Sequence, residues 1–467
     1  MIVGRRSFAI VLIVTAGMAA RVTAQTPAPT VSQDSIDRGR ELVRILLETL
    51  ELPGLSITVM VGGQVAWSEG FGCANLETGT PATTATKYRI GSVSKLITAA
   101  TLARLVEEQR FELDAPVQRY VPDFPDHDAA ITARMLAGHL GGIRHYQGDF
   151  LNREHYASVT DALSRFRDDP LRHTPGDRYA YSSFGYVLLS AMMEGATGKG
   201  FLDLVHEELL VPLGMNSTEP DIVFAIVPDR SGVYTRADGQ LRKGAYIDLS
   251  DRWAAGGFLS TSEDMARLGA AHLGNRFFSS KTQELLFTSQ KTASGEKTNV
   301  GIGWRIAEDA RGRRYYHHGG SNIGGRAMLA VFPDADVVVS ILANLGRAPF
   351  GRPEAVTIAE LFMPQAGDGS VWDPAGVFDY ERTTKEGAVR GTLTLTRTGR
   401  GLSGAIRPEE GAEMPVVWTS VRGAELSLVA ADPRGQLEIV WLHRDGSNLA
   451  GSTWRRNGDF RARRRMK

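Results

Sequence analysis

Strand-like patterns lie at both ends of the first 363 residues of this 467-residue chain, and helical patterns fill the stretch between them. Residues 55–72 alternate like two strands around Gly62-Gly63, which is typical of a β-hairpin. Strand patterns return over 300–344, and a helical pattern follows them. Because the helical patterns of about 95–275 separate the two groups of strands, we expect an α+β domain whose antiparallel sheet is built from both ends of the sequence.

The composition changes at residues 364–376, where glycine, proline and serine replace the regular patterns. Beyond this segment, short alternating stretches separated by turns predict a small all-β domain, either a barrel or a sandwich. The basic end of the chain, "RARRRMK", is interpreted as a solvated tail. The predicted parts are a signal peptide 1–24, a linker 25–35, an α+β domain 36–363, a linker 364–372 and a C-terminal β-domain 373–467.

The first 24 residues have the pattern of an export signal. Arg5 and Arg6 precede an apolar stretch, 8–20, which is too short to span a bilayer comfortably, and Val22–Ala24 has the small-residue spacing of a cleavage site. The paired arginines also resemble a twin-arginine signal, and an uncleaved membrane anchor is the alternative. We expect an exported protein, periplasmic or extracellular, with no stable membrane span after cleavage.

Charge and composition exclude several classes of partner. Lys+Arg and Asp+Glu balance at 53 each, so nothing indicates a nucleic-acid partner. The single cysteine, Cys73, excludes an intrachain disulfide and a cysteine-based metal site. The histidines do not follow metal-binding spacings such as H-E-x-x-H, so we expect no metal and no cofactor. The candidate histidines are His145, His155, His317 and His318. The oligomeric state is left open.

The segment "YRIGSVSKLITAATLARLVEEQ" combines a small polar turn with a helical pattern. Ser92 and Lys95 are three residues apart, so a helix places both on one face, and Ser92 falls where free N–H groups favour negative charge. A buried Lys95 would have a lowered pKa and accept the serine proton. The alternative is a helix-capping serine beside a surface lysine. A second Ser-x-x-Lys match, Ser294 to Lys297, lies in a polar stretch without a following helix and is interpreted as a loop.

Two later segments carry matching chemistry. In "PGDRYAYSSFGYVLLSAMME", Tyr181 stands just before a helix, and a phenol held near cationic groups has a depressed pKa and can relay protons. In "YYHHGGSNIGG", His318-Gly319-Gly320 leads to Ser321, and the glycines allow a substrate carbonyl to approach the strand. A backbone N–H of that strand, paired with the N–H of Ser92, would form an oxyanion hole. There is no G-x-S-x-G elbow, which argues against an α/β-hydrolase.

Ser-x-x-Lys, Tyr-Ser-x and His-x-Gly, in this order, resemble the motifs of the serine β-lactamase and penicillin-binding-protein superfamily, in its class C and esterase branch. The segments "ITARMLAGHLGGIRHY", "FRDDPL", "PGDRYAYSSFGY" and "RWAAGGFLST" are similar to the mitochondrial serine β-lactamase-like protein and its bacterial relatives. The resemblance covers about residues 36–362 and implies a β-lactamase/transpeptidase-like fold with "RWAAGGFLST" bordering the pocket. His139 is interpreted as a structural residue that orients its loop.

The resemblance also implies roles for individual residues. Ser92 is the acylated nucleophile, Lys95 activates it and Tyr181 is the general base. The N–H groups of Ser92 and Ser321 form the oxyanion hole. The implied substrate-binding residues are Ser183, His318, Gly319 and Gly320. The implied activity is hydrolysis of peptide or ester bonds through an acyl-enzyme, including D-alanyl-D-alanine peptides.

One departure separates this chain from many members of the resembled family. Ser183 stands where the second motif often has asparagine, and a hydroxyl is shorter and has fewer donors than an amide. Efficient β-lactam turnover is therefore not expected. The alternatives are a weak β-lactamase and a catalytically silent cell-wall or ligand-binding protein on the same fold.

Overall fold

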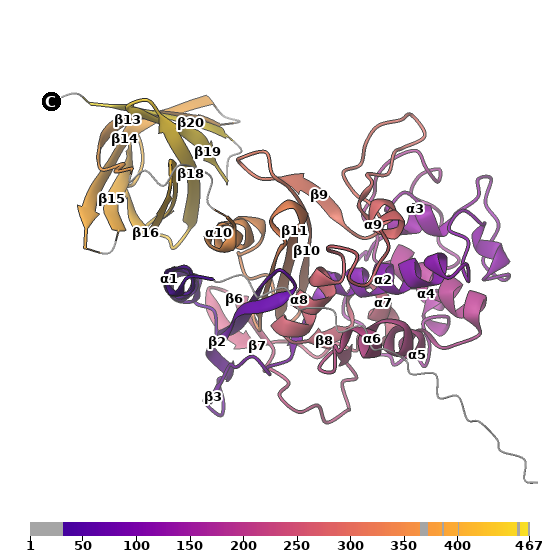
Figure 1. Cartoon of the computed structure of the whole chain (residues 1–467). Coiled ribbons are helices and arrows are strands. Elements are labelled where there is room, and N and C mark those ends of the chain that lie inside the picture. Colours follow the sequence, from indigo (N-terminus) through magenta and orange to yellow (C-terminus); the bar gives the residue numbers. More distant parts are fainter. Residues whose placement is uncertain (1–30, 365–371, 385–386, 400, 455–457, 466–467) are drawn as a thin grey trace, which may run out of the picture.

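The structure, a computed structural model, describes residues 31–364, 372–384, 387–399, 401–454 and 458–465. The predicted signal peptide and most of both predicted linkers lie outside these ranges. Figure 1 shows a β-barrel of C-terminal residues beside the helices α1 and α10, with a central sheet next to them and a helical region at the opposite end. Within the described ranges, no helix is both long and apolar enough to cross a membrane.

A seven-stranded sheet, in the order β3-β2-β1-β12-β11-β10-β9, forms the centre of the first domain. Its strands are β1 Gly54–Val61, β2 Gln64–Asn75, β3 Thr80–Pro81, β9 Arg305–Glu308, β10 Arg314–Asn322, β11 Gly325–Phe332 and β12 Val337–Ala343. Strand β1 pairs with β2 across the predicted hairpin and with β12 on its other side, from Leu55↔Ala343 to Val61↔Val337. The expectation of an α+β sheet built from both ends of the sequence is therefore confirmed.

Helices cover both faces of this sheet. On one face, α1 Gln33–Thr49 and α10 Arg352–Phe362 pack against alternate residues of β1 and β12, such as Val59 and Val339. On the other face, α8 Ser262–Ala270 packs against Val338, the next residue of β12. Because both faces are buried, β1 and β12 are apolar along nearly their whole length rather than alternating.

The middle of the chain supplies the helical region. Its other helices are α2 Ser94–Glu107, α3 Ala133–Ala137, α4 Phe184–Thr197, α5 Phe201–Val205, α6 Val211–Leu213, α7 Trp253–Gly256 and α9 Ser280–Phe287. Short strands accompany them: β4 Tyr88–Arg89, β5 Glu219–Pro220, β6 Tyr234–Ala237, β7 Gln240–Lys243 and β8 Phe258–Ser260. Helices α2 and α4 are buried on nearly all sides and form the centre of this region. Their apolar residues belong to the same core as residues of β11 and β12.

The C-terminal β-domain is a closed barrel of eight strands, β13 to β20. The strands are β13 Gly376–Thr384, β14 Gly387–Thr398, β15 Gly401–Pro408, β16 Met414–Arg422, β17 Glu425–Ala431, β18 Leu437–Asp445, β19 Asn448–Thr453 and β20 Gly458–Arg464. The interpretation of "RARRRMK" as a solvated tail is wrong for residues 461–464, which pair with β13 and close the barrel. Phe460 and Ala462 point to the barrel core, while Arg461 between them and Arg463 after them are exposed, so the strand alternates despite its charge.

The barrel is packed firmly on the first domain. Trp418 and Trp441 of the barrel belong to the same apolar core as the residues of α1 and α10. Beside this core, Glu360 of α10 accepts a hydrogen bond from Arg313, the residue just before β10, over 2.6 Å. It accepts another from Ser427 of β17 over 2.9 Å. As a result, the turn between β17 and β18 is held close to the end of α1, where Gly435 lies next to Thr49.

Candidate active site

The structure places the predicted nucleophile Ser92 and its predicted activating residue Lys95 within hydrogen-bond distance of each other. Ser92 lies in a single 3₁₀ turn, Gly91–Val93, which leads directly into α2, and Lys95 lies one turn further on. Lys95 is fully buried, so it is not a surface lysine. Its Nζ lies 3.3 Å from Ser92 Oγ, 3.0 Å from Ser183 Oγ and 2.7 Å from the carbonyl oxygen of Ala255. The prediction that Ser92 and Lys95 share one helix face is confirmed.

The surroundings of Lys95 favour its neutral form. Burial lowers the pKa of Lys95 well below its usual value, and the positive charges of Arg305 and Arg252 lower that pKa further. A neutral amine has two N–H groups and one lone pair. Two acceptors, Ala255 O and Ser183 Oγ, are available for the N–H groups, so the lone pair is free to take the proton of Ser92.

Tyr181 joins the same cluster, although its titration differs from the expectation. Hydrogen bonding with Ser92 and Ser183 acts to lower the pKa of its hydroxyl, and Lys95 Nζ lies 4.9 Å from its ring centroid. We expected a depressed pKa. Burial instead raises the pKa of Tyr181, and the opposing effects of these hydrogen bonds and of Arg305 do not overcome it. The phenol is therefore neutral near pH 7 and suits a proton relay better than an anionic base.

Two histidines fix the Tyr181-Ser182-Ser183 segment. The backbone N–H of Ser182 donates to His139 Nδ1 and that of Ser183 donates to His145 Nδ1, each over 3.2 Å. Burial lowers the pKa of His139 well below its usual value and that of His145 to about 4, so both rings stay neutral acceptors. The structural role predicted for His139 is confirmed. The contribution of His145 could not be predicted, because its ring meets the Ser183 N–H only in the folded chain.

Two glycines let the nucleophile turn and strand β10 approach each other closely. A Cβ on Gly91 would lie 2.6 Å from the Ser321 nitrogen, and one on Gly320 would lie 3.0 Å from the Ser92 nitrogen. Gly91 also has a φ of 51°, a left-handed conformation that glycine adopts without strain. The backbone nitrogens of Ser92 and Ser321 are thereby brought near one another at the cleft, which is the arrangement that an oxyanion hole needs.

The remaining predicted residues of β10 lie beside the cleft. His318 is buried, its ring centroid is 6.4 Å from that of Tyr181, and its Nδ1 hydrogen-bonds the Gly319 carbonyl over 2.8 Å. Burial, with Arg305 and Lys95 adding to it, lowers the pKa of His318 to about 3. Gly319 lines a separate cavity. Within the described part of the chain, Ser321 and Asn322 line the main cleft at this strand, and His318, Gly319 and Gly320 do not.

The cleft in front of Ser92 has a volume of about 1350 Å³. Its inner wall includes Ser183, Tyr146 and three residues of "RWAAGGFLST", namely Arg252, Ala255 and Gly256, as expected for that segment. Its rim includes Arg236, Arg347 and the β17–β18 turn of the barrel, residues 433–436. The barrel therefore contributes directly to the entrance of the cleft, which the sequence did not indicate.

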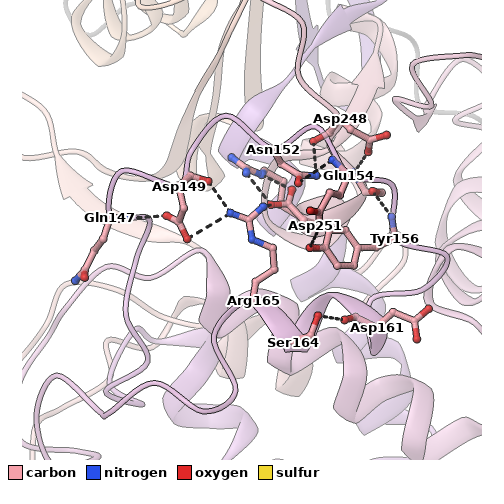
Figure 2. Close-up of polar contacts among 12 residues, drawn as sticks. Gln147, Asp149, Asn152, Glu154, Tyr156, Asp161, Ser164, Arg165, Asp248 and Asp251 are labelled. Atoms are coloured by element: carbon pink, nitrogen blue, oxygen red, sulfur yellow. Dashed lines mark hydrogen bonds and ion pairs between the residues drawn. The ribbon is translucent and has the colours of Figure 1, made fainter.

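A polar network supports the wall that carries Arg252 (Figure 2). Arg165 donates to the carboxylate of Asp251 over 2.8 Å, and the Asn152 amide donates to the Asp248 carbonyl over 3.2 Å. Arg252 donates to the same Asp251 carboxylate through Nε and Nη2, over 2.6 and 2.7 Å. Only 1% of Arg252 is exposed, and even paired with Asp251 its positive charge lowers the pKa of Lys95. Arg252 and Arg305 were both missed at the sequence level.

The second Ser-x-x-Lys match is a loop, as interpreted. Ser294 and Lys297 are exposed, lie outside any helix, and the Ser294 hydroxyl hydrogen-bonds its neighbour Thr292 over 2.8 Å. Among the described residues, no three His, Cys, Asp or Glu side chains gather in a metal-binding arrangement.

The fold and this Ser-Lys-Tyr cluster define a protein of the serine β-lactamase and penicillin-binding-protein type. A family model described as "Beta-lactamase" matches residues 40–361, which is more than half of the chain, and the chain therefore belongs to the beta-lactamase family. The resemblance derived from the three motifs is confirmed.

Individual proteins agree with this assignment. The chain is 27% identical over 433 residues to the human mitochondrial serine beta-lactamase-like protein LACTB, covering 69% of this chain and 79% of that protein. It is 27% identical over 326 residues to penicillin-binding protein 4* of Bacillus subtilis, covering 65% and 72%. The octameric penicillin-binding protein homologue of Pyrococcus abyssi has a similar fold, with a TM-score of 0.61 at 20% identity over 92% of this chain and all of that chain.

Proposed function

We propose that this protein is an exported hydrolase that cleaves peptide or ester bonds through an acyl-enzyme on Ser92. The observation that carries the proposal is the fully buried Lys95 amine, placed between Ser92 Oγ, Ser183 Oγ and the Ala255 carbonyl. Burying an amine costs free energy, and a catalytically silent protein would gain nothing in return. Export rests on the N-terminal sequence alone.

The proposed reaction begins with proton transfer from Ser92 to neutral Lys95. The serine oxygen forms a bond to the substrate carbonyl carbon, and the N–H groups of Ser92 and Ser321 bind the resulting oxyanion. The proton on Lys95 then passes through the Tyr181 hydroxyl to the leaving nitrogen or oxygen, and the bond to the leaving group breaks. A water molecule repeats these steps on the acyl-enzyme and releases Ser92.

The cleft favours an extended substrate. Its volume of about 1350 Å³ exceeds what a drug-sized ligand needs, and its walls come from both domains. Ser183 is committed to Lys95, and its hydroxyl is too short to orient a substrate amide in the way that asparagine does. We therefore rank peptide or ester first, D-alanyl-D-alanine peptide second and β-lactam third.

An active-site label tests the proposal directly. A fluorophosphonate or a labelled penicillin should modify the wild-type protein and the Ser294→Ala control, and should leave Ser92→Ala unmodified. A folded wild-type protein that takes up neither label would exclude the hydrolase and favour the silent alternative. A panel of p-nitrophenyl esters, D-alanyl-D-alanine peptides and nitrocefin then determines the substrate class.

A further inference from the structure

A second cavity, of about 680 Å³, lies beside the cleft in front of Ser92, and Pro349 lines both. Strand β10 contributes His317 and Gly319 to it, β9 contributes Arg305, and the start of α10 contributes Arg352. The barrel closes it with Trp454 and two residues of β18. The side chains of His317 and His318 point to opposite faces of β10, so the cavity and the nucleophile lie on different sides of that strand.

Three arginines line this cavity, and none of them forms an ion pair with a carboxylate of the described residues. Arg305 donates to the Tyr179 hydroxyl over 3.2 Å, Arg326 donates to the carbonyl of Phe350 over 2.9 Å, and Arg352 stacks on the ring of Trp454 at 4.4 Å. The neighbouring Arg313 behaves differently, because Asp309 and Glu360 neutralise it. Within the described residues, the guanidinium charges around the cavity are therefore compensated only in part.

A buried histidine of the same cavity, His317, indicates a ligand independently of the three arginines. His317 is only 6% exposed, and within the described residues its Nδ1 has no hydrogen-bond partner. Leaving a buried polar nitrogen without a partner costs free energy, which a bound hydrogen-bonding group would recover. One carboxylate, Glu354, also lines the cavity; it accepts the backbone N–H of Gly351 at the start of α10 over 2.7 Å, and its charge acts on Arg326.

We propose that this cavity is a binding site for a multiply charged oxyanion, either phosphate or the phosphate group of a monoester. Three guanidinium groups provide planar N–H pairs that match phosphate oxygens, and the excess of three arginines over the one carboxylate of Glu354 favours a dianion over a singly charged carboxylate. The cavity has room for more than the phosphate group alone, so a monoester fits as well as the free ion. The site is separate from the acyl-enzyme cleft and does not depend on the proposed hydrolysis.

Isothermal titration calorimetry of the full-length protein tests this site. Inorganic phosphate, glycerol 3-phosphate and acetate are titrated into wild type, Arg352→Gln, Arg326→Gln and the control Arg314→Gln. Arg314 lies on β10 but is exposed and does not line the cavity. We expect one phosphate site per chain, weakened about tenfold or more in the two cavity variants and unchanged in the control, with acetate much weaker. Preference for glycerol 3-phosphate over phosphate would identify a monoester as the ligand.

Controls separate loss of binding from loss of fold. Arg326 holds the Phe350 carbonyl, so each variant's melting temperature is measured without phosphate, and Arg352→Lys should keep part of the affinity because it keeps the charge. Ser92→Ala should bind phosphate like wild type, which makes this test independent of catalysis. No binding in wild type up to about 10 mM phosphate, or equal binding in wild type and the folded cavity variants, would overturn the proposal.

Discussion

The Nζ atom of Lys95 lies 3.0 Å from Oγ of Ser183, closer than the 3.3 Å that separates it from Oγ of Ser92. Ser183 and the carbonyl of Ala255, at 2.7 Å, are thus the two acceptors that orient the N–H groups of the Lys95 amine. With both N–H groups engaged, the lone pair has one remaining partner, the hydroxyl of Ser92. The residue that departs from the family's asparagine is therefore part of how the base is positioned.

Replacing Ser183 by alanine should lower kcat about five- to tenfold, because one hydrogen bond that orients the Lys95 amine is worth about 1 kcal/mol. KM should change less, since the fold and the cleft are kept. Ester hydrolysis and the rate of fluorophosphonate labelling measure the effect. Ser294→Ala is the matched control and should behave like wild type. An unchanged kcat in Ser183→Ala would show that Ser183 does not position the base.

Replacing Arg305 by glutamine should move the acid limb of the kcat/KM profile to higher pH. The Arg305 charge lowers the pKa of Lys95 by disfavouring the ammonium form. Removing that charge raises the pKa of Lys95, so a smaller fraction of the amine is neutral at any pH on that limb. The exposed Arg314→Gln leaves the profile in place. A limb that stays where it is in Arg305→Gln, or moves to lower pH, would contradict this electrostatic role.

Replacing Lys95 by methionine should abolish hydrolysis and change the pH dependence of stability. In the unfolded chain the lysine binds a proton below its usual pKa of about 10.4, whereas the buried amine releases it. Folding of wild type therefore loses stability as pH falls below that value, and Lys95→Met does not share this loss. Chemical denaturation should show the stability of Lys95→Met relative to wild type to be greater at pH 7 than at pH 10. A difference independent of pH would mean that the buried amine stays protonated.

Alanine at Gly320 and at Gly319 should have opposite outcomes. A Cβ on Gly320 would lie 1.9 Å from the Ile90 carbonyl oxygen, so β10 and the nucleophile turn would have to separate. A Cβ on Gly319 has its nearest neighbour at 3.7 Å, an ordinary contact. We expect at least about a hundredfold loss of kcat/KM in Gly320→Ala, as for loss of an oxyanion-hole donor, and near wild-type activity in Gly319→Ala. Equal activities of the two variants would remove the geometric basis of the oxyanion hole.

Patterns that depend on local spacing could be predicted from the sequence. The hairpin at Gly62-Gly63, the Ser92–Lys95 helix face and the sheet built from both ends all follow from periodicity and chain order. The barrel was predicted as one of two all-β folds. Its last strand was missed, because the arginines of 461–464 conceal the alternation that places Ala462 in the core.

Contacts between distant segments could not be predicted in this way. His145 receives the N–H of a residue 38 positions away, and Arg305 affects Lys95 only because the edge strand β9 lies beside the Tyr181 ring. The raised pKa of Tyr181 depends on how completely the fold buries it, which composition and spacing do not determine. A positive charge near the phenol was foreseen correctly, but burial outweighs it.

The pairing of β13 with β20 sets the order in which the fold can be completed. The barrel cannot close until residue 464 has been synthesised, so the 433–436 turn is fixed at the rim of the cleft only after β20 is available. A chain that ends before β20 has the residues of the Ser92–Lys95 pair but cannot close the barrel that carries part of the cleft rim. The cleft in front of Ser92 therefore depends on strands at both ends of the described fold.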